Sequence, residues 1–405
     1  MTGAATRSMG LAASLRLGTL VLLALPGLAL AGVKETLAGL APSAQVLVVD
    51  SEGHELVAQN ADAPFVPASV AKLVTAWLAM DVLGADYRFE TRFYLDAKRT
   101  LYVRGGGDPF LVSEELAQLA ADLVAATGKE PIGAIVVDAS HYPADLRVPG
   151  VENDGKAYDA LNGALAVNFN TIFAVRRGDV VRSAEPQTPI TPLAISEFRA
   201  RGPRGTGRIS LSQDPDVSLR YAGELIAAFI ARAGASVTGA ISIGKTPEGL
   251  APIYVHRQSR PLSDILIELL RASNNFIANQ VFLEIGAHAR GGPVSLEKSL
   301  GVAEEKLAAV GLAQEIHLEE GSGLDRADSV TTRGLAKLLG LFAAHADLLR
   351  GHDGGMDKSG TLDGVRTLAG YADTAGHGRV RFVIALAGND GAMRFRLLQA
   401  IEAGL

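Results

Sequence analysis

The chain has 405 residues and contains no cysteine. It therefore offers no thiol for a lipoprotein-type anchor and no disulfide, so its stability must come from a packed core. His-Glu-x-x-His, Gly-x-Ser-x-Gly and Walker sequences are also absent. These absences remove the usual signatures of zinc peptidases, α/β-hydrolases and P-loop enzymes. We expect neither a bound metal nor a cofactor.

The N-terminus has the pattern of an export signal. No acidic residue precedes Glu35, Arg7 and Arg16 supply positive charge, and residues 17–30 form an apolar run. The sequence Ala29-Leu30-Ala31 provides the small residues of a cleavage site. Because the run is too short to span a bilayer comfortably, a signal peptide over residues 1–31 is favoured over a retained anchor. The mature protein is expected to be periplasmic, with no stable membrane anchor.

The overall charge narrows the range of partners. The formal net charge is −6, and removal of the two arginines of the signal makes it −8. An acidic chain argues against nucleic acid or an anionic membrane as the main partner. About 374 residues remain after cleavage, a length typical of roughly two to three domains. Nothing in the sequence indicates the oligomeric state.

The kind of secondary structure that the sequence predicts changes twice along the chain. Residues 44–50 and 54–58 predict a hairpin, and an apolar helix follows from about Ser69 to Leu83. Short alternating segments then fill residues 85–255, and long helices return after Pro261. Apolar strands at 365–372 and 380–387 precede a final helix.

We predict from this order of elements an α+β protein. Residues 32–84 and 256–405 form one domain, an antiparallel sheet packed by helices, and residues 85–255 form one or two inserted α+β subdomains.

Ser69-Val70-Ala71-Lys72 is the first motif that carries chemistry. Ser69 and Lys72 are three residues apart on a helix, so their side chains project from one face. A lysine can take the serine proton only when it is neutral, and burial near a second cation lowers its pKa. The backbone N–H of the serine lies at the helix start, ready to donate to an oxyanion. The alternative is a helix cap followed by a surface lysine.

Two other Ser-x-x-Lys sequences test how specific this motif is. Ser242 and Lys245 lie in a strand-to-loop stretch, where their side chains would not meet. Ser295 and Lys298 begin a helix with a polar face, where the serine is suited to an N-cap. Only Ser69 begins an almost wholly apolar helix.

Two further motifs occur once each in the chain. Ser273-Asn274-Asn275 lies between two predicted helices, where a hydroxyl can pass a proton to a leaving amine and the Asn275 carboxamide can hold a substrate amide. Lys358-Ser359-Gly360-Thr361 has the character of a strand edge that binds a carboxylate. Glycine there admits the substrate backbone, and the Thr361 N–H can complete an oxyanion hole. The alternatives are a helix cap and a polar turn.

Together these motifs resemble those of the class C low-molecular-mass penicillin-binding proteins, the D-alanyl-D-alanine carboxypeptidase/endopeptidase family. The resemblance also includes Leu101–Pro109, Asn168-Phe169-Asn170 and Gly321-Ser322-Gly323-Leu324, and it covers nearly all of the mature chain. The spacing of 204 residues from Ser69 to Ser273 fits the family's large insertion and is far too long for a simple β-lactamase.

The resemblance implies cleavage of D-Ala-D-Ala in peptidoglycan stem peptides, or of D-Ala–diaminopimelate cross-bridges, through an acyl-enzyme on Ser69. It implies β-lactams as covalent inhibitors.

The chain departs from the family's pattern at two motif positions: Asn274 and Ser359 stand where the family often has Asp and Thr. Only 35 positions separate Gly323 from Lys358, where family members usually carry a longer stretch beside the cleft.

That shortening motivates a second hypothesis, a degenerate peptidoglycan-binding or scaffold protein of the same fold. A third, a β-lactamase, is disfavoured by the insertion and by the lack of an evident deacylation glutamate. The sequence does not separate carboxypeptidase from endopeptidase activity.

Overall fold

The computed structural model describes residues 26–151, 155–352 and 354–405. Most of the predicted signal sequence, including its charged start, belongs to residues 1–25 and lies outside the described residues. Its last residues, Pro26–Ala31, belong to helix α1, Pro26–Leu40. Among the helices of the described ranges, none combines the length and the apolar character needed to cross a bilayer.

A six-stranded antiparallel sheet joins the two ends of the chain. Its order is β13-β14-β15-β16-β1-β2, so the strands that follow the lysine motif lie beside those near the N-terminus. The apolar runs of β15 and β16 explain their central positions, since both of their faces are covered. The strands are β1 Gln45–Val49, β2 Glu55–Gln59, β13 Arg350–His352, β14 Gly355–Leu362, β15 Val365–Thr374 and β16 Gly378–Ala387.

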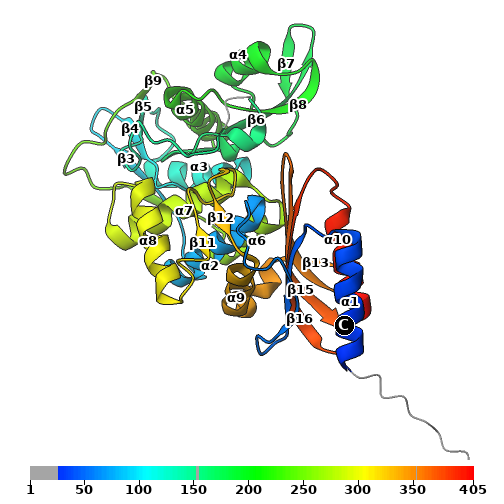
Figure 1. Cartoon of the computed structure of the whole chain (residues 1–405). Coiled ribbons are helices and arrows are strands. Elements are labelled where there is room, and N and C mark those ends of the chain that lie inside the picture. Colours follow the sequence, from blue (N-terminus) through cyan, green and yellow to red (C-terminus); the bar gives the residue numbers. More distant parts are fainter. Residues whose placement is uncertain (1–25, 152–154, 353) are drawn as a thin grey trace, which may run out of the picture.

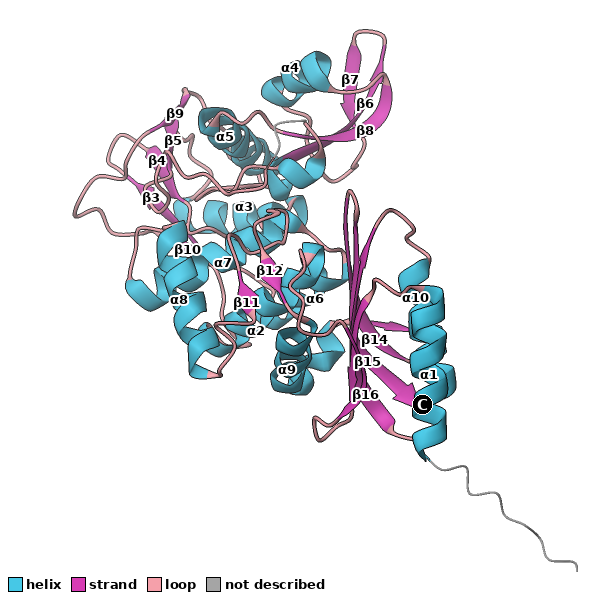
Figure 2. Cartoon of the chain, in the orientation of Figure 1, coloured by secondary structure: helices cyan, strands magenta, loops and turns pink. Residues whose placement is uncertain are grey.

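Helices cover both faces of this sheet (Figure 1). On one face, α1 packs beside α10, Met393–Gly404, through a buried apolar cluster that includes Val33, Leu37 and Ile401. On the other face lies a second group of helices, which Figure 2 shows beside the strands and of which α2 and α7 begin within the first two motifs. These are α2 Lys72–Val82, α6 Leu262–Arg271, α7 Asn275–Arg290, α8 Leu296–Ala309 and α9 Thr332–Phe342.

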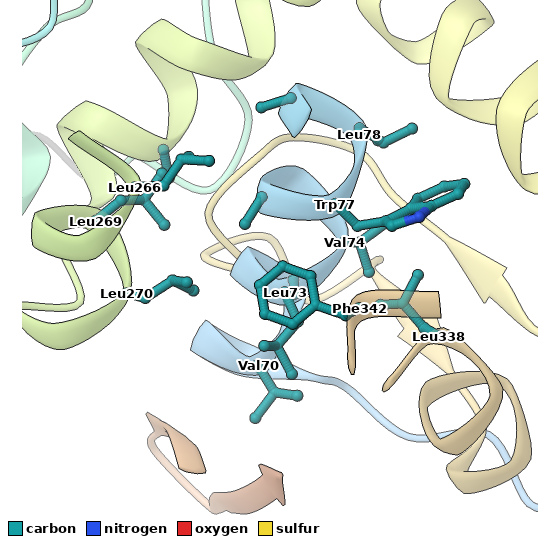
Figure 3. Close-up of a cluster of buried hydrophobic side chains, with 14 of the residues drawn as sticks. Val70, Leu73, Val74, Trp77, Leu78, Leu266, Leu269, Leu270, Leu338 and Phe342 are labelled. Atoms are coloured by element: carbon teal, nitrogen blue, oxygen red, sulfur yellow. The ribbon is translucent and has the colours of Figure 1, made fainter. Parts of the chain in front are cut away.

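Helix α2 lies at the centre of the second group. Its residues from Lys72 to Ala79 are all buried, and Leu73, Val74 and Leu78 belong to one apolar cluster with side chains of α6 and α9 (Figure 3). Burial of each such aliphatic side chain contributes about 1.5–3 kcal/mol. Gly84, which has a positive φ, follows the end of α2 and terminates the helix. The packing therefore holds the start of α2 in one place relative to its neighbours.

The helix predicted from Ser69 to Leu83 forms in two pieces. A 3₁₀ turn, η1 Ala68–Ala71, carries Ser69 and leads directly into α2. Ser69 and Lys72 still lie about one turn apart, because the 3₁₀ turn continues into the α-helix without a break.

The chain between α2 and α6 forms two smaller sheets with their own helices. A five-stranded mixed sheet, β10-β3-β4-β5-β9, and a three-stranded sheet, β7-β6-β8, share one apolar cluster with α3 and α5. The elements are β3 Glu90–Leu95, β4 Thr100–Arg104, α3 Ser113–Thr127, β5 Ala134–Asp138, β6 Thr171–Arg177, β7 Val180–Ser183, α4 Pro192–Arg201, β8 Gly205–Ser210, α5 Pro215–Arg232, β9 Ile241–Ile243 and β10 Tyr254–Arg257. A short two-stranded sheet, β11 Ile316–His317 and β12 Ser329–Val330, lies between α8 and α9. The predicted fold class, α+β with an antiparallel sheet packed by helices, is confirmed.

Candidate active site

Ser69 and Lys72 are in direct contact at the junction of η1 and α2. Lys72 Nζ lies 3.0 Å from Ser69 Oγ, and it also donates to Asn275 Oδ1 at 2.7 Å and to the Ser322 carbonyl at 2.6 Å. Lys72 is fully buried, whereas Ser69 remains partly accessible. A partly exposed hydroxyl beside a buried amine is the arrangement that a serine nucleophile with a lysine base requires.

The surroundings of Lys72 favour its neutral form. Its pKa is lowered from 10.5 to about 7, first because burial removes the ammonium from water and then because Lys358 adds a second positive charge. Glu320 and Asp328 oppose this shift. At neutral pH about half of the Lys72 side chains are therefore able to accept a proton.

The carbonyl that holds Lys72 belongs to a loop shaped by a buried carboxylate. Glu320 is fully buried, and its two oxygens accept hydrogen bonds from the backbone N–H groups of Ser322 and Leu324, both at 2.7 Å. Gly323, in the same loop, has a φ of +80°, and a Cβ there would lie 1.9 Å from the Ala68 carbonyl oxygen. The loop can thus approach the Ser69 turn only with glycine at this position.

Asp328 is a second buried acid near this loop. Its Oδ1 accepts from the Glu319 N–H at 2.7 Å, whereas its Oδ2 has no hydrogen-bond partner among the described residues. Burial, reinforced by the charge of Glu320, raises the pKa of Asp328 to about 8. The sequence analysis missed both acids, because they influence the site through loop shape and charge and carry no motif of their own.

The second motif forms the turn between α6 and α7. Ser273 has a φ of +55°, an uncommon conformation for a residue with a side chain, and Asn274 caps α7 by accepting from the Ile277 N–H. This turn directs Ser273 Oγ toward Lys358 Nζ, 2.8 Å away, and Asn275 Oδ1 toward Lys72. The cap that was the alternative interpretation is present, but Asn274 provides it, and its two neighbours contact the lysines.

The third motif lies in strand β14. Lys358 is 3% exposed, and burial lowers its pKa to about 8, with Asp357 opposing the shift. Past Asp357, no strand of the described residues pairs with β14 on the side of the short strand β13, so Lys358, Ser359 and Gly360 lie at a free edge of the sheet. This is a strand, as the first interpretation held, and not the polar turn of the alternative.

Gly360 brings β14 against the Ser69 turn. A Cβ at this position would lie 3.0 Å from the Ser69 backbone nitrogen and 2.8 Å from the Pro67 carbonyl oxygen. Thr367 of β15 reinforces the contact by donating from its hydroxyl to the same Pro67 carbonyl at 2.7 Å. The strand edge and the serine turn are therefore held close together by a position that only glycine fills without displacement.

Thr361 and Arg394 show where the expectation was incomplete. The Thr361 hydroxyl accepts from Arg394 Nη1 at 3.1 Å, and the same nitrogen donates to the carbonyls of Gly360 at 2.6 Å and Thr367 at 3.3 Å. Arg394 belongs to α10 and is 9% exposed. This arginine, which the sequence analysis did not select, supports the lysine strand from the opposite face.

The two other Ser-x-x-Lys sequences lie away from the site. Ser242 is in strand β9, and Ser295 is the N-cap of α8, where its hydroxyl accepts from the Lys298 N–H. In residues 26–151, 155–352 and 354–405, no group of three or more His, Asp and Glu side chains is arranged to hold a metal ion.

The fold with its three converging motifs defines the class of the chain: it has the fold of the penicillin-binding and β-lactamase-like proteins. It superposes on penicillin binding protein 4 of Haemophilus influenzae with a TM-score of 0.71 at 21% identity, over 87% of this chain and 93% of that one. It superposes on the predatory peptidoglycan endopeptidase of Bdellovibrio bacteriovorus with a TM-score of 0.52 at 17% identity, over 88% and 90% of the two chains.

The chain belongs to the D-Ala-D-Ala carboxypeptidase 3 (S13) family, whose model matches residues 35–195 and 203–354. It is 28% identical to the D-alanyl-D-alanine carboxypeptidase of Actinomadura sp. (strain R39), over 89% of this chain and 80% of that protein. It is 24% identical to D-alanyl-D-alanine carboxypeptidase DacB of Haemophilus influenzae, over 78% and 79%. The family match ends at residue 354, before Lys358. The assignment of Lys358 to the site therefore depends on where β14 lies in the structure.

Proposed function

We propose that this chain is an exported, penicillin-sensitive serine peptidase that cleaves D-Ala-D-Ala, D-Ala–diaminopimelate cross-bridges, or both in peptidoglycan. The observation that carries the proposal is the 3.0 Å contact between Ser69 Oγ and a buried Lys72 whose pKa is lowered to about 7. The family of the chain and the names of its carboxypeptidase relatives support the substrate class.

The proposed reaction begins with Ser69. As its Oγ attacks the carbonyl carbon of the penultimate D-Ala, the hydroxyl proton passes to neutral Lys72. The N–H groups of Ser69 and Thr361 stabilise the resulting oxyanion. The C–N bond then breaks, the departing amine takes up a proton delivered through Ser273, and an ester remains on Ser69. Water attacks this ester, releasing the shortened peptide and restoring the serine hydroxyl.

The remaining site residues hold the substrate in this scheme. Asn275 accepts from Lys72 through Oδ1, which leaves its amide N–H groups for a substrate carbonyl. Lys358 and Ser359 bind the terminal carboxylate, and Gly360 lets the substrate backbone lie along β14. Hydrogen bonding between Lys358 and Ser273 links carboxylate binding to the proton path.

Location and domain organisation complete the proposal. We propose that residues 1–31 direct export to the periplasm and are removed there. We further propose that residues 32–84 and 256–405 form the catalytic domain and that residues 85–255 are inserted subdomains. The joining of β1 and β2 with β13–β16 in one sheet supports this division.

The alternatives are less well supported. A degenerate scaffold would not need a buried lysine in contact with the serine, and the short stretch before Lys358 leaves these contacts in place. A class A β-lactamase needs a glutamate that activates water for deacylation. Glu320 is a buried glutamate whose charge acts on Lys72, but backbone N–H groups occupy both of its oxygens.

The proposal is tested with a purified pentapeptide stem ending in D-Ala-D-Ala. Wild type should release D-Ala, Ser69→Ala should release none, and Ser295→Ala, which alters the unrelated Ser-x-x-Lys sequence, should match wild type. A Ser69→Ala variant as active as wild type would refute the assignment of the nucleophile. A folded wild-type protein that binds peptidoglycan and cleaves no muropeptide would favour the scaffold.

A further inference from the structure

A cavity opens beside the lysine strand, where the stretch between Gly323 and Lys358 is short. Its volume is about 430 Å³, within the usual range of roughly 300–1,000 Å³ for small-molecule sites. Ser273, Lys358 and Ser359 line one end of it, and the other lining residues come mainly from α6, β13 and α10. The cavity therefore continues from the catalytic motifs along the free edge of β14 toward α10.

The position of the cavity indicates which half of the substrate enters it. In the proposed function, Ser273 delivers the proton to the departing amine, so the leaving group must lie alongside Ser273. Ser69, Lys72 and Asn275, which handle the acyl half, are not among the lining residues. The cavity thus lies on the leaving-group side of the scissile bond.

The lining suits a leaving group much larger than alanine. Leu270, Phe395 and Leu398 provide apolar surface that an aliphatic chain can cover. Arg350, on β13, is exposed and provides a guanidinium, which is suited to a carboxylate. The methyl group of a terminal D-alanine would leave nearly all of this space unused.

One carboxylate in the cavity has an oxygen without a hydrogen-bond partner among the described residues. Glu402 of α10 lines it, and Glu402 Oε1 is buried and accepts no hydrogen bond from any described residue. Burial, together with the nearby charge of Asp357, raises the pKa of Glu402, with His352 opposing the shift. The carboxylate as a whole is only partly buried, so an N–H donor from a ligand in the cavity can reach it through its more exposed oxygen.

We propose that this cavity is a leaving-group subsite that binds the diamino acid residue of a peptidoglycan cross-bridge, with Glu402 and Arg350 as specificity-determining residues. The inference rests on the proposed function. The aliphatic chain of the diamino acid lies over the apolar lining. Its amide or ammonium N–H donates to Glu402, and a peptide carboxylate meets Arg350.

The test compares two substrates in the same enzyme: a cross-linked muropeptide dimer and a pentapeptide stem ending in D-Ala-D-Ala. Gln399→Trp places a large ring in the cavity, because Gln399 is an exposed lining residue on α10. We expect its kcat/KM for the dimer to fall at least about tenfold, and that for the pentapeptide to stay within about twofold of wild type. Arg396→Trp, on the same helix and outside the cavity lining, is the matched control and should change neither value.

A second variant keeps the test decisive if the tryptophan disturbs folding. Glu402→Gln should lower kcat/KM for the dimer selectively, with Glu304→Gln on α8 as its control. Equal losses on both substrates, or no loss on either, would overturn the subsite while leaving the peptidase intact. A wild-type protein that cleaves neither substrate and is not acylated by penicillin would instead overturn the proposed function, and the subsite with it.

Discussion

The pH dependence of acylation by benzylpenicillin is a direct consequence of where Lys72 lies. An unperturbed lysine with a pKa of 10.5 would be neutral in only about one molecule in 3,000 at pH 7. With its pKa lowered to about 7, roughly half of the molecules hold a neutral base. Burial of this side chain therefore increases the reactive population by a factor on the order of a thousand.

The direction in which the acylation rate changes with pH follows from the pKa of Lys72. Because the base must be neutral, the second-order acylation rate constant should rise about tenfold per pH unit below pH 7 and level off above it. Lys358 must stay charged to hold the carboxylate, and its pKa is about 8, so the rate should fall again above that value. The result is a narrow bell, whose two apparent pKa values belong to the coupled pair of lysines.

Stopped-flow or quenched-flow labelling between pH 5.5 and 10 measures this profile. Lys72→Arg is the control, since a guanidinium remains charged throughout and should lack both the activity and the acidic limb. An acylation rate that does not change between pH 5.5 and 7.5, or an acidic limb centred near pH 10, would refute the assignment of Lys72 as the base.

Three other perturbations test separate parts of the site. Gly360→Ala introduces a Cβ 3.0 Å from the Ser69 nitrogen, so β14 must shift, and penicillin acylation should fall about 100-fold while circular dichroism stays unchanged. Asn275→Ala removes the acceptor 2.7 Å from Lys72 Nζ and should slow acylation by about 10- to 100-fold; a change below twofold would contradict its role. Asp328→Asn concerns stability. In the unfolded chain Asp328 has a pKa of 3.8 and loses its proton above that pH, whereas in the fold it stays protonated up to about pH 8. Wild type therefore loses stability as the pH rises from 3.8 toward 8. Relative to wild type, the variant should gain up to about 4 kcal/mol in free energy of unfolding between pH 5 and 8 in urea titrations; a pH-independent difference would contradict this.

The nucleophile and its base could be predicted from local sequence, because the physical requirement is itself local. A lysine one turn after a serine is unremarkable on a surface helix, but Lys72 lies in a run of apolar residues that can only be buried. Ser295 failed the same criterion, since its helix has a polar face, and the structure places it as an N-cap. Hydrophobic patterning likewise predicted the paired strands β15 and β16.

The supporting residues could not be predicted in this way, because their partners are distant along the chain. Arg394 lies on an ordinary amphipathic helix, and only the packing of α10 against the sheet brings its guanidinium to the Gly360 carbonyl. Glu320 and Asp328 act through loop shape and charge, which no spacing rule encodes. For Glu402, the unpaired oxygen is visible only once β13 and α10 are placed.

Identification of the penicillin adduct tests the central claim most directly. After incubation with benzylpenicillin, intact-protein mass spectrometry should show one added penicilloyl group, and peptide mapping should locate it on Ser69. The Ser69→Ala variant should remain unmodified, whereas Ser242→Ala and Ser295→Ala should be modified as fully as wild type. An adduct on any other residue, or a folded wild-type protein that forms none, would contradict the account.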